Sequence, residues 1–227
     1  MKKRRQGRNH DILSSIHLQM NEFEPLNKNQ AIMFNSENNI VAHGSAGTGK
    51  TFLATLLAVK MIFQAREMDR VLFIRSAVPT RDLGFLKGSD KEKVEVYETP
   101  YKDILAEIFN RGDAYDILKA KGYLEFMSTS FIRGTTINNT VLIVDECQNM
   151  SYHELDSVIT RVGKNCRVFF CGDMLQADLE KNGIKDFFSV LKAMNEFDFI
   201  EFGMDDIVRS DFVKNYLISK QQILGTT

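Results

Sequence analysis

The amino-acid sequence predicts a three-layer α/β fold, in which helices cover both faces of a mainly parallel, five-stranded sheet. Two observations lead to this prediction. Short runs rich in β-branched and aromatic residues alternate with longer segments of helical character, as in proteins whose parallel strands are joined by right-handed helical crossovers. Glycine or acidic residues directly follow several of the strand-like runs, which places candidate ligand-binding residues at the carboxyl ends of parallel strands.

Length and composition are those of a globular protein with one substantial core. The chain has 227 residues, of which 44% are hydrophobic and 26% charged, and these fractions exclude the disordered and fibrous classes. No apolar run reaches the ~20 residues of a membrane span, and the amino-terminus lacks a hydrophobic signal region. We therefore expect a cytoplasmic protein. Cys147, Cys166 and Cys171 have spacings typical of neither a zinc site nor a disulfide framework, so we interpret them as reduced core residues.

The first residues differ in charge from the rest of the chain. The formal net charge is −1, yet residues 2–8 contain lysines and arginines and no acidic residue. We predict a flexible basic arm over residues 1–11 and a single domain over residues 12–227. The arm either contacts nucleic acid or serves only as a solubilising tail, and the sequence leaves both roles open.

The first elements follow from local patterns. A helix is expected from residue 26 to about residue 35 with Asn27 as its cap, and an apolar strand follows at 39–43. The nearly all-apolar segment 50–66 predicts a helix buried against the sheet. The next strand, 71–74, ends in Arg75.

The middle of the chain gives weaker signals. Residues 76–90 contain proline and glycine and indicate a loop. Helix-compatible sequence follows from about 91 to 121 with a break near Gly112, and 123–127 is a further candidate strand.

The second half is more regular. Residues 140–144 form an uninterrupted apolar run, typical of a central parallel strand. Ser151 and Glu154 have the spacing of a capping box and predict a helix over 151–162. The remaining elements are a strand at 167–171, a helix at 184–196, a strand at 197–202 and a helix at 211–224.

A glycine-rich loop joins the first strand to the long apolar helix. Residues 44–51 read Gly-Ser-Ala-Gly-Thr-Gly-Lys-Thr, the pattern of a loop whose backbone N–H groups converge on phosphate oxygens. Lys50 can reach the β and γ phosphates, and the Thr51 hydroxyl can hold Mg²⁺. The sequence therefore predicts a site for a nucleoside triphosphate. Its binding residues are Gly44, Ser45, Ala46, Gly47, Thr48, Gly49, Lys50 and Thr51.

Acidic and amide side chains complete the predicted site. Asp145, at the end of a buried strand, can hold Mg²⁺ through water together with Thr51, and Glu146 can orient or deprotonate the attacking water. A base at this position favours hydrolysis over transfer to a second substrate. Gln176 follows the neighbouring strand, where it either contacts the γ-phosphate or the water, or is a turn residue bonded to nearby backbone. The Gln30 amide can donate and accept, which suits an adenine edge.

Six blocks of this sequence resemble, in order, those of the PhoH-like family. The resemblance implies a RecA-like fold similar to the ATP-binding core of superfamily 1 helicases, hydrolysis of ATP with Mg²⁺, an RNA or single-stranded DNA partner, and a homo-oligomer in the form of a ring-shaped hexamer. Small single-domain members are common in bacteriophages, for which the location would be the host cytoplasm. The blocks are residues 26–30, 44–51, 75 with 83–88, 132–138, 144–150 and 172–179.

The resemblance also assigns roles to single residues. It makes Gln30 the reader of adenine, and Gln148 and Gln176 couplers near the hydrolytic water. The late block 206–209 makes Arg209 the candidate arginine finger, a guanidinium that neutralises charge on the transferred phosphoryl group. The sequence departs from the family pattern at Ser76, Cys147 and Ser210, which bears on the outer loops and subunit contacts rather than on the phosphate chemistry.

The sequence supplies one RecA-like lobe, whereas a complete helicase of this kind closes two lobes over ATP. We therefore expect an oligomeric, helicase-like ATPase in which Arg209 enters the site of a neighbouring subunit. Arg75, Arg81 and Arg133 are the candidate nucleic-acid contacts, and salt bridges are the alternative role for each. The alternative function is a nucleotide-dependent scaffold with slow ATPase and no unwinding activity. A nuclease has less support because the histidines are dispersed along the chain.

Overall fold

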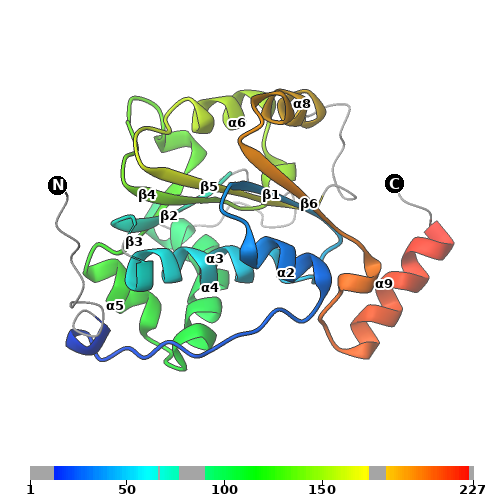
Figure 1. The fold of residues 1–227 in the computed structure, drawn as a ribbon, viewed down its shortest axis with the longest axis horizontal. Coiled ribbons are helices and arrows are strands. Elements are labelled where there is room, and N and C mark those ends of the chain that lie inside the picture. The colour runs from blue at the N-terminus through cyan, green and yellow to red at the C-terminus, as the bar shows by residue number, and fades with distance from the viewer. Residues whose placement is uncertain (1–12, 66, 77–89, 174–182, 225–227) are drawn as a thin grey trace.

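One six-stranded parallel sheet lies between two layers of helices (Figure 1). The structure, a computed structural model, describes residues 13–65, 67–76, 90–173 and 183–224. The strand order is β3-β2-β4-β5-β1-β6. The three-layer α/β prediction is confirmed, but the predicted number of five strands was wrong. The basic arm, residues 1–11, lies outside the described residues.

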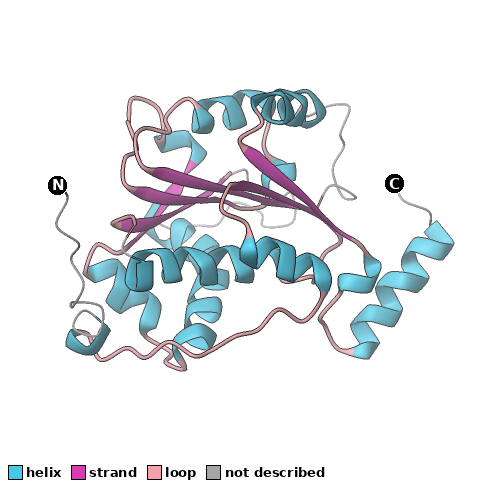
Figure 2. Ribbon diagram, in the orientation of Figure 1, coloured by secondary structure: helices cyan, strands magenta, loops and turns pink. Residues whose placement is uncertain are grey.

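Helices separate most of the strands in sequence, and in space they lie on both sides of the sheet (Figure 2). The strands are β1 Asn39–Gly44, β2 Arg70–Arg75, β3 Leu124–Ser128, β4 Thr140–Val144, β5 Cys166–Gly172 and β6 Phe197–Phe202. The helices are α2 Lys28–Asn35, α3 Lys50–Lys60, α4 Asp90–Phe109, α5 Ala114–Ala120, α6 Tyr152–Ile159, α8 Ile184–Met194 and α9 Asp211–Leu224. Short helical turns are η1 Met61–Ala65, η2 Thr129–Phe131, η3 Cys147–Asn149 and η5 Met204–Asp206.

The sixth strand is β3, at the edge of the sheet beside β2, and it confirms the further candidate strand at 123–127. It pairs in parallel with β2, with Leu124 opposite Val71. Polar side chains interrupt this strand, and Glu125 forms an ion pair with Arg70 of β2 (Nη1 to Oε2, 2.7 Å). An edge strand has this mixed character because one of its margins has no strand partner, so its apolar pattern is weaker than that of β4.

Two apolar clusters lie on opposite faces of the sheet. On β4, Val141 and Ile143 pack with the cluster beneath α3, α4 and α5, while Leu142 and Val144 pack with the cluster beneath α6 and α8. Every residue of β4 is buried, because helices cover both faces (Figure 1). This double burial explains the uninterrupted apolar run of the central strand. In the described part of the chain no helix has the length and apolar character needed to cross a bilayer.

The position of β5 determines which loops meet at the carboxyl edge of the sheet. β5 pairs with β1, with Cys171 opposite Ala42, and with β4, with Phe170 opposite Val144. The glycine-rich loop after β1 and the acidic pair after β4 therefore lie on either side of the end of β5. All three ends point the same way because the strands are parallel.

Local capping signals predicted the amino-terminal starts of two helices correctly. The Asn27 side chain caps α2 by accepting a hydrogen bond from the Gln30 backbone N–H at 2.8 Å. Ser151 and Glu154 form the expected capping box at α6. The segment expected as one helix over 50–66 instead consists of α3 followed by the π-helical turn η1.

Replacement of Gly44 by alanine is expected to destabilise the protein by about 1–3 kcal/mol. Gly44 has φ +115°, and an added Cβ would lie 2.1 Å from the Phe202 carbonyl oxygen of β6. Chemical denaturation without nucleotide measures the effect, with Gly112→Ala as the control because an added Cβ there meets nothing within 4 Å. Equal loss of stability in the two variants would contradict this assignment.

Candidate nucleotide site

The glycine-rich loop lies between the end of β1 and the start of α3. Gly47 and Gly49 have φ +75° and +84°, a region that residues with a Cβ rarely adopt. Their backbone conformation lets successive N–H groups face a common centre. The amino-terminal end of α3 begins at Lys50 and adds the positive end of its helix dipole.

The Lys50 ammonium lies inside this loop. Its Nζ donates hydrogen bonds to the carbonyl oxygens of Gly44 at 3.0 Å and Ser45 at 2.6 Å, and the residue is 8% exposed. Burial lowers the pKa of Lys50, whereas the negative charges of Asp173, Glu146 and Asp145 act to raise it. A cation surrounded by backbone dipoles and carboxylates is suited to binding a phosphate chain that brings negative charge.

Asp145 receives hydrogen bonds at both of its carboxylate oxygens. The Thr51 hydroxyl donates to Oδ1 at 2.7 Å, and the Tyr101 hydroxyl of α4 donates to Oδ2 at 3.0 Å. Burial raises the pKa of Asp145, while these two hydrogen bonds act to lower it. Burial, followed by the charge of Asp145, raises the pKa of the Tyr101 phenol well above its usual value, so Tyr101 is the donor in this contact.

These oxygens fit the predicted metal. The structure brings the Thr51 hydroxyl and the Asp145 carboxylate into direct contact, although they are far apart in the sequence. Hydroxyl and carboxylate oxygens are the donors that Mg²⁺ prefers, with water filling its remaining positions. Thr51 and Asp145 therefore remain the residues assigned to Mg²⁺.

Glu146 begins the turn after β4 in an unusual backbone conformation. Its φ is +51°, which is left-handed and costs free energy in a residue other than glycine. The Gln148 amide nitrogen donates to Glu146 Oε2, and the Gln148 amide oxygen accepts from the Asp173 backbone N–H at 3.0 Å. Gln148 thus connects the ends of β4 and β5 and fixes the Glu146 carboxylate.

Gln30 lies buried against the phosphate loop. Its amide oxygen accepts from the Leu26 backbone N–H at 2.8 Å, and its amide nitrogen donates to the Thr48 carbonyl oxygen at 3.0 Å. One amide hydrogen and one lone pair remain available after these contacts. The amide is therefore held in a fixed orientation beside the loop.

Arg209 lies on the phosphate loop of its own chain. The Val208 backbone N–H donates to the Gly47 carbonyl oxygen at 3.1 Å. A Cβ added to Gly47 would lie 2.9 Å from Cγ and 3.7 Å from Nε of Arg209. The sequence predicts that Arg209 acts on a neighbouring subunit; in the structure its side chain lies beside the phosphate loop of its own chain.

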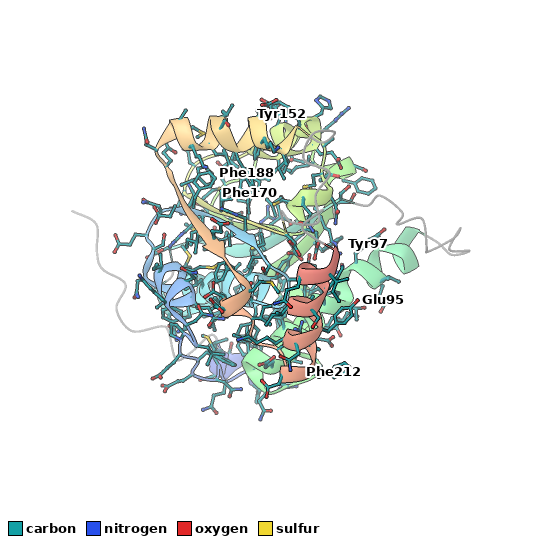
Figure 3. All side chains as sticks on the ribbon, turned by 90° about the vertical axis from the view of Figure 1, so that its right-hand side faces the viewer. Glu95, Tyr97, Tyr152, Phe170, Phe188 and Phe212 are labelled. Atoms are coloured by element: carbon teal, nitrogen blue, oxygen red, sulfur yellow. The ribbon has the colours of Figure 1, made fainter. Side chains whose placement is uncertain are left out.

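Two of the three candidate nucleic-acid residues, Arg75 and Arg133, lie at or shortly after the ends of β2 and β3. Arg75 ends β2, and its guanidinium carbon lies 5.8 Å from the ring centre of Tyr97 on α4, labelled in Figure 3. Arg133 follows η2 and lies exposed, with Nη2 3.0 Å from Nε2 of His153. Arg81, like the predicted catalytic residue Gln176, lies outside the described residues.

Glu154 connects the elements at this edge through hydrogen bonds. Its Oε1 accepts hydrogen bonds from the hydroxyls of Ser76 at 2.9 Å and Thr129 at 2.7 Å. Burial acts to raise the pKa of Glu154, but hydrogen bonds from Ser151, Thr129 and Ser76 together lower it. The ends of β2 and β3 are thereby attached to the start of α6.

Two further residues at this edge do not stand out in the sequence. Tyr101 belongs to no motif, and only tertiary packing brings it to Asp145. Phe131 of η2 is 68% exposed, and its position beside the basic residue Arg133 is the signal that could have identified it.

The cysteines are free, with Cys147 and Cys171 buried, and burial raises the pKa of both thiols.

The parallel sheet, the phosphate loop after β1 and the Asp-Glu pair after β4 together define a P-loop NTPase of the RecA-like kind. The chain belongs to the PhoH-like family, since the family model described as "PhoH-like protein" matches residues 22–219. A PhoH-like protein of Synechocystis sp. is 35% identical over 81% of this chain and 57% of its own length. Protein PhoH of Escherichia coli is 31% identical over 75% of this chain and 49% of its own length.

The comparison with solved structures supports the same fold. The large terminase of a thermophilic bacteriophage, solved in complex with ATP-gamma-S, aligns with a TM-score of 0.54 at 15% identity. The alignment covers 85% of this chain and 49% of the terminase chain. At this identity the likeness concerns the fold alone. The chain spans about half the length of the curated relatives that it matches.

Proposed function

We propose that this protein binds ATP with Mg²⁺ and hydrolyses it to ADP and phosphate. The observation that carries the proposal is the convergence of Lys50, Thr51, Asp145 and Glu146 at one edge of the sheet. Lys50 is positioned for the phosphates, the Thr51 and Asp145 oxygens for the metal, and Glu146 for the attacking water. Membership of the PhoH-like family supports the same chemistry.

Each residue has a separate role in this mechanism. The loop N–H groups and Lys50 orient the triphosphate and offset its charge. Thr51 and Asp145 hold Mg²⁺, which when bound neutralises charge on the β and γ phosphates. Glu146 accepts a proton from the water that attacks the γ-phosphorus, and Gln148 keeps its carboxylate in place. Gln30 reads the adenine edge, and Gln176, which lies outside the described residues, stays a candidate for contact with the γ-phosphate or the attacking water.

Arg209 supplies positive charge to the γ-phosphate in this proposal, from the same chain that carries the phosphate loop. The contact between the Arg209 side chain and Gly47 supports this arrangement. A guanidinium that meets charge developing in the transition state accelerates phosphoryl transfer by roughly 10³- to 10⁵-fold in related chemistry.

Mixing Arg209→Ala protein with Glu146→Gln protein is expected to restore no ATPase activity at any ratio. Every site in the mixture then lacks either its own base or its own arginine. The measurement is phosphate release after the two proteins are denatured and refolded together, with self-mixed wild type as the control. Restored activity would contradict the proposal and support an arginine supplied by a neighbouring subunit.

We further propose that the partner is RNA or single-stranded DNA, bound along the edge that carries Arg75 and Arg133, with Arg81 kept as a candidate contact outside the described residues. Exposed Arg133 supplies charge for phosphates, and exposed Phe131 supplies a ring on which a base can stack. The hydrogen bonds of Glu154 to Ser76 and Thr129 hold the ends of β2 and β3 together. We take this edge to be the nucleic-acid surface of a helicase-like ATPase.

Replacement of Arg133 by alanine is expected to weaken binding of single-stranded nucleic acid without sequence preference. Loss of one phosphate contact reduces the slope of log affinity against log salt by about 0.7 for a single strand. Fluorescence anisotropy with a labelled oligonucleotide measures both effects. The control is Lys164→Ala, which removes one positive charge from the loop before β5, and an equal change in both variants would count against a local contact.

The alternative function is that of a nucleotide-dependent assembly scaffold. Helix α9 supports self-association of the chain in both functions. Phe212, Tyr216 and Ile223 lie on one face of α9 and are 83%, 61% and 79% exposed, and Figure 3 labels Phe212 on this helix. We propose a homo-oligomer of this chain, with the hexamer that the family resemblance implies. Turnover stimulated by nucleic acid favours the helicase-like ATPase, whereas slow turnover indifferent to nucleic acid favours the scaffold.

A further inference from the structure

Asp145 accepts hydrogen bonds from residues of two helices, and one of these two contacts comes from outside the nucleotide-binding motifs. Thr51 of α3 donates to Oδ1, and Tyr101 of α4 donates to Oδ2. The first contact follows from the phosphate loop itself. The second comes from α4, which lies outside the phosphate loop and the helix that follows it.

The Tyr101 hydroxyl is fixed by the packing of its ring. Tyr101 is fully buried, at 0% exposure. Its ring stacks on Phe73 of β2, with centroids 4.1 Å apart and an interplanar angle of 21°, and lies 6.0 Å from the Phe126 ring of β3. A close-packed aromatic ring of this kind cannot turn without opening the core. The hydroxyl therefore approaches Asp145 from one direction.

This arrangement controls the orientation of the carboxylate. With one donor on each oxygen, Asp145 cannot rotate without breaking a buried hydrogen bond, which is costly. The remaining lone pairs of both oxygens then point in fixed directions. Hydrogen bonds that orient metal ligands typically change metal affinity by about 10- to 100-fold when they are removed.

We propose that Tyr101 is a positioning residue for Mg²⁺, which fixes the Asp145 carboxylate where it accepts hydrogen bonds from the water shell of Mg·ATP. The inference rests on the proposed function, because it takes Mg·ATP to be the ligand. Tyr101→Phe keeps the packed ring and removes only the donor. Asp145 then keeps only the hydrogen bond from Thr51, and its carboxylate is no longer fixed at Oδ2.

The test measures binding rather than turnover. The affinity of full-length protein for a fluorescent, non-hydrolysable ATP analogue is measured in EDTA and across a Mg²⁺ titration, alongside thermal unfolding. In Tyr101→Phe we expect unchanged nucleotide affinity in EDTA. We also expect a rise of about 10- to 100-fold in the Mg²⁺ concentration at which half of the metal-dependent gain in nucleotide affinity is reached. Tyr115→Phe is the matched control, since Tyr115 is another buried tyrosine, at 1% exposure, on α5.

Three outcomes would overturn the inference, and the third of them would also contradict the proposed function. Wild-type Mg²⁺ dependence in Tyr101→Phe shows that the hydroxyl does not position the ligand. An equal shift in Tyr115→Phe shows a general effect of losing a buried hydroxyl. A wild-type protein whose nucleotide affinity gains nothing from Mg²⁺ contradicts the proposed function, and the inference fails with it.

Discussion

Replacing Lys50 by alanine is expected to lower kcat for ATP hydrolysis by roughly 10²- to 10³-fold and to weaken ATP binding. The ammonium is the cation enclosed by the phosphate loop, where it contacts the carbonyl oxygens of Gly44 and Ser45. Within residues 44–51, Lys50 is the one residue with a positively charged side chain. Phosphate release and equilibrium binding of a fluorescent ATP analogue measure the two effects.

The control for this variant is Lys60→Ala. Lys60 ends the same helix, α3, and its ammonium lies 4.3 Å from the ring centre of Phe34 rather than near the loop. We expect Lys60→Ala to hydrolyse ATP at close to the wild-type rate. If Lys50→Ala retained wild-type binding and turnover, the assignment of the loop as the phosphate site would be untenable.

Glu146→Gln is expected to lower kcat by roughly 10²- to 10⁴-fold, the contribution of a general base, while ATP binding survives. The amide has nearly the same shape as the carboxylate but cannot accept the proton of the attacking water. Gln148 can still contact it, so the turn after β4 is retained. Single-turnover hydrolysis separates this chemical step from binding.

The control for the base is Glu107→Gln, a carboxylate near the end of α4. This variant removes the same charge far from the strand ends and should hydrolyse ATP like wild type. Unchanged single-turnover hydrolysis in Glu146→Gln would remove the base from the mechanism. A parallel loss of ATP affinity would instead indicate a structural role for Glu146.

The features that the sequence predicts well are local. The phosphate loop is contiguous in sequence, so its glycines and Lys50 specify their own geometry. The Asn27 cap and the Ser151–Glu154 capping box each depend on residues three apart. The central strand β4 is recognisable because burial on both faces makes every position apolar or nearly so.

The features that the sequence does not predict depend on tertiary packing. Tyr101 reaches Asp145 only because α4 packs against the sheet beside β2, and no periodic pattern records that contact. The position of Arg209 depends on how the chain returns from β6 over the phosphate loop, where Val208 bonds to Gly47. The edge strand β3 carries a mixed pattern because its outer margin is not paired within the sheet.

The central claim is that the assembled site hydrolyses ATP, and the most direct measurement follows labelled ATP to its products in a single turnover with enzyme in excess. We expect wild-type protein to convert the bound ATP to ADP and phosphate in a reaction that requires Mg²⁺. Recovery of the bound ATP intact in the presence of Mg²⁺ would contradict the claim and leave a protein that binds the nucleotide without hydrolysing it.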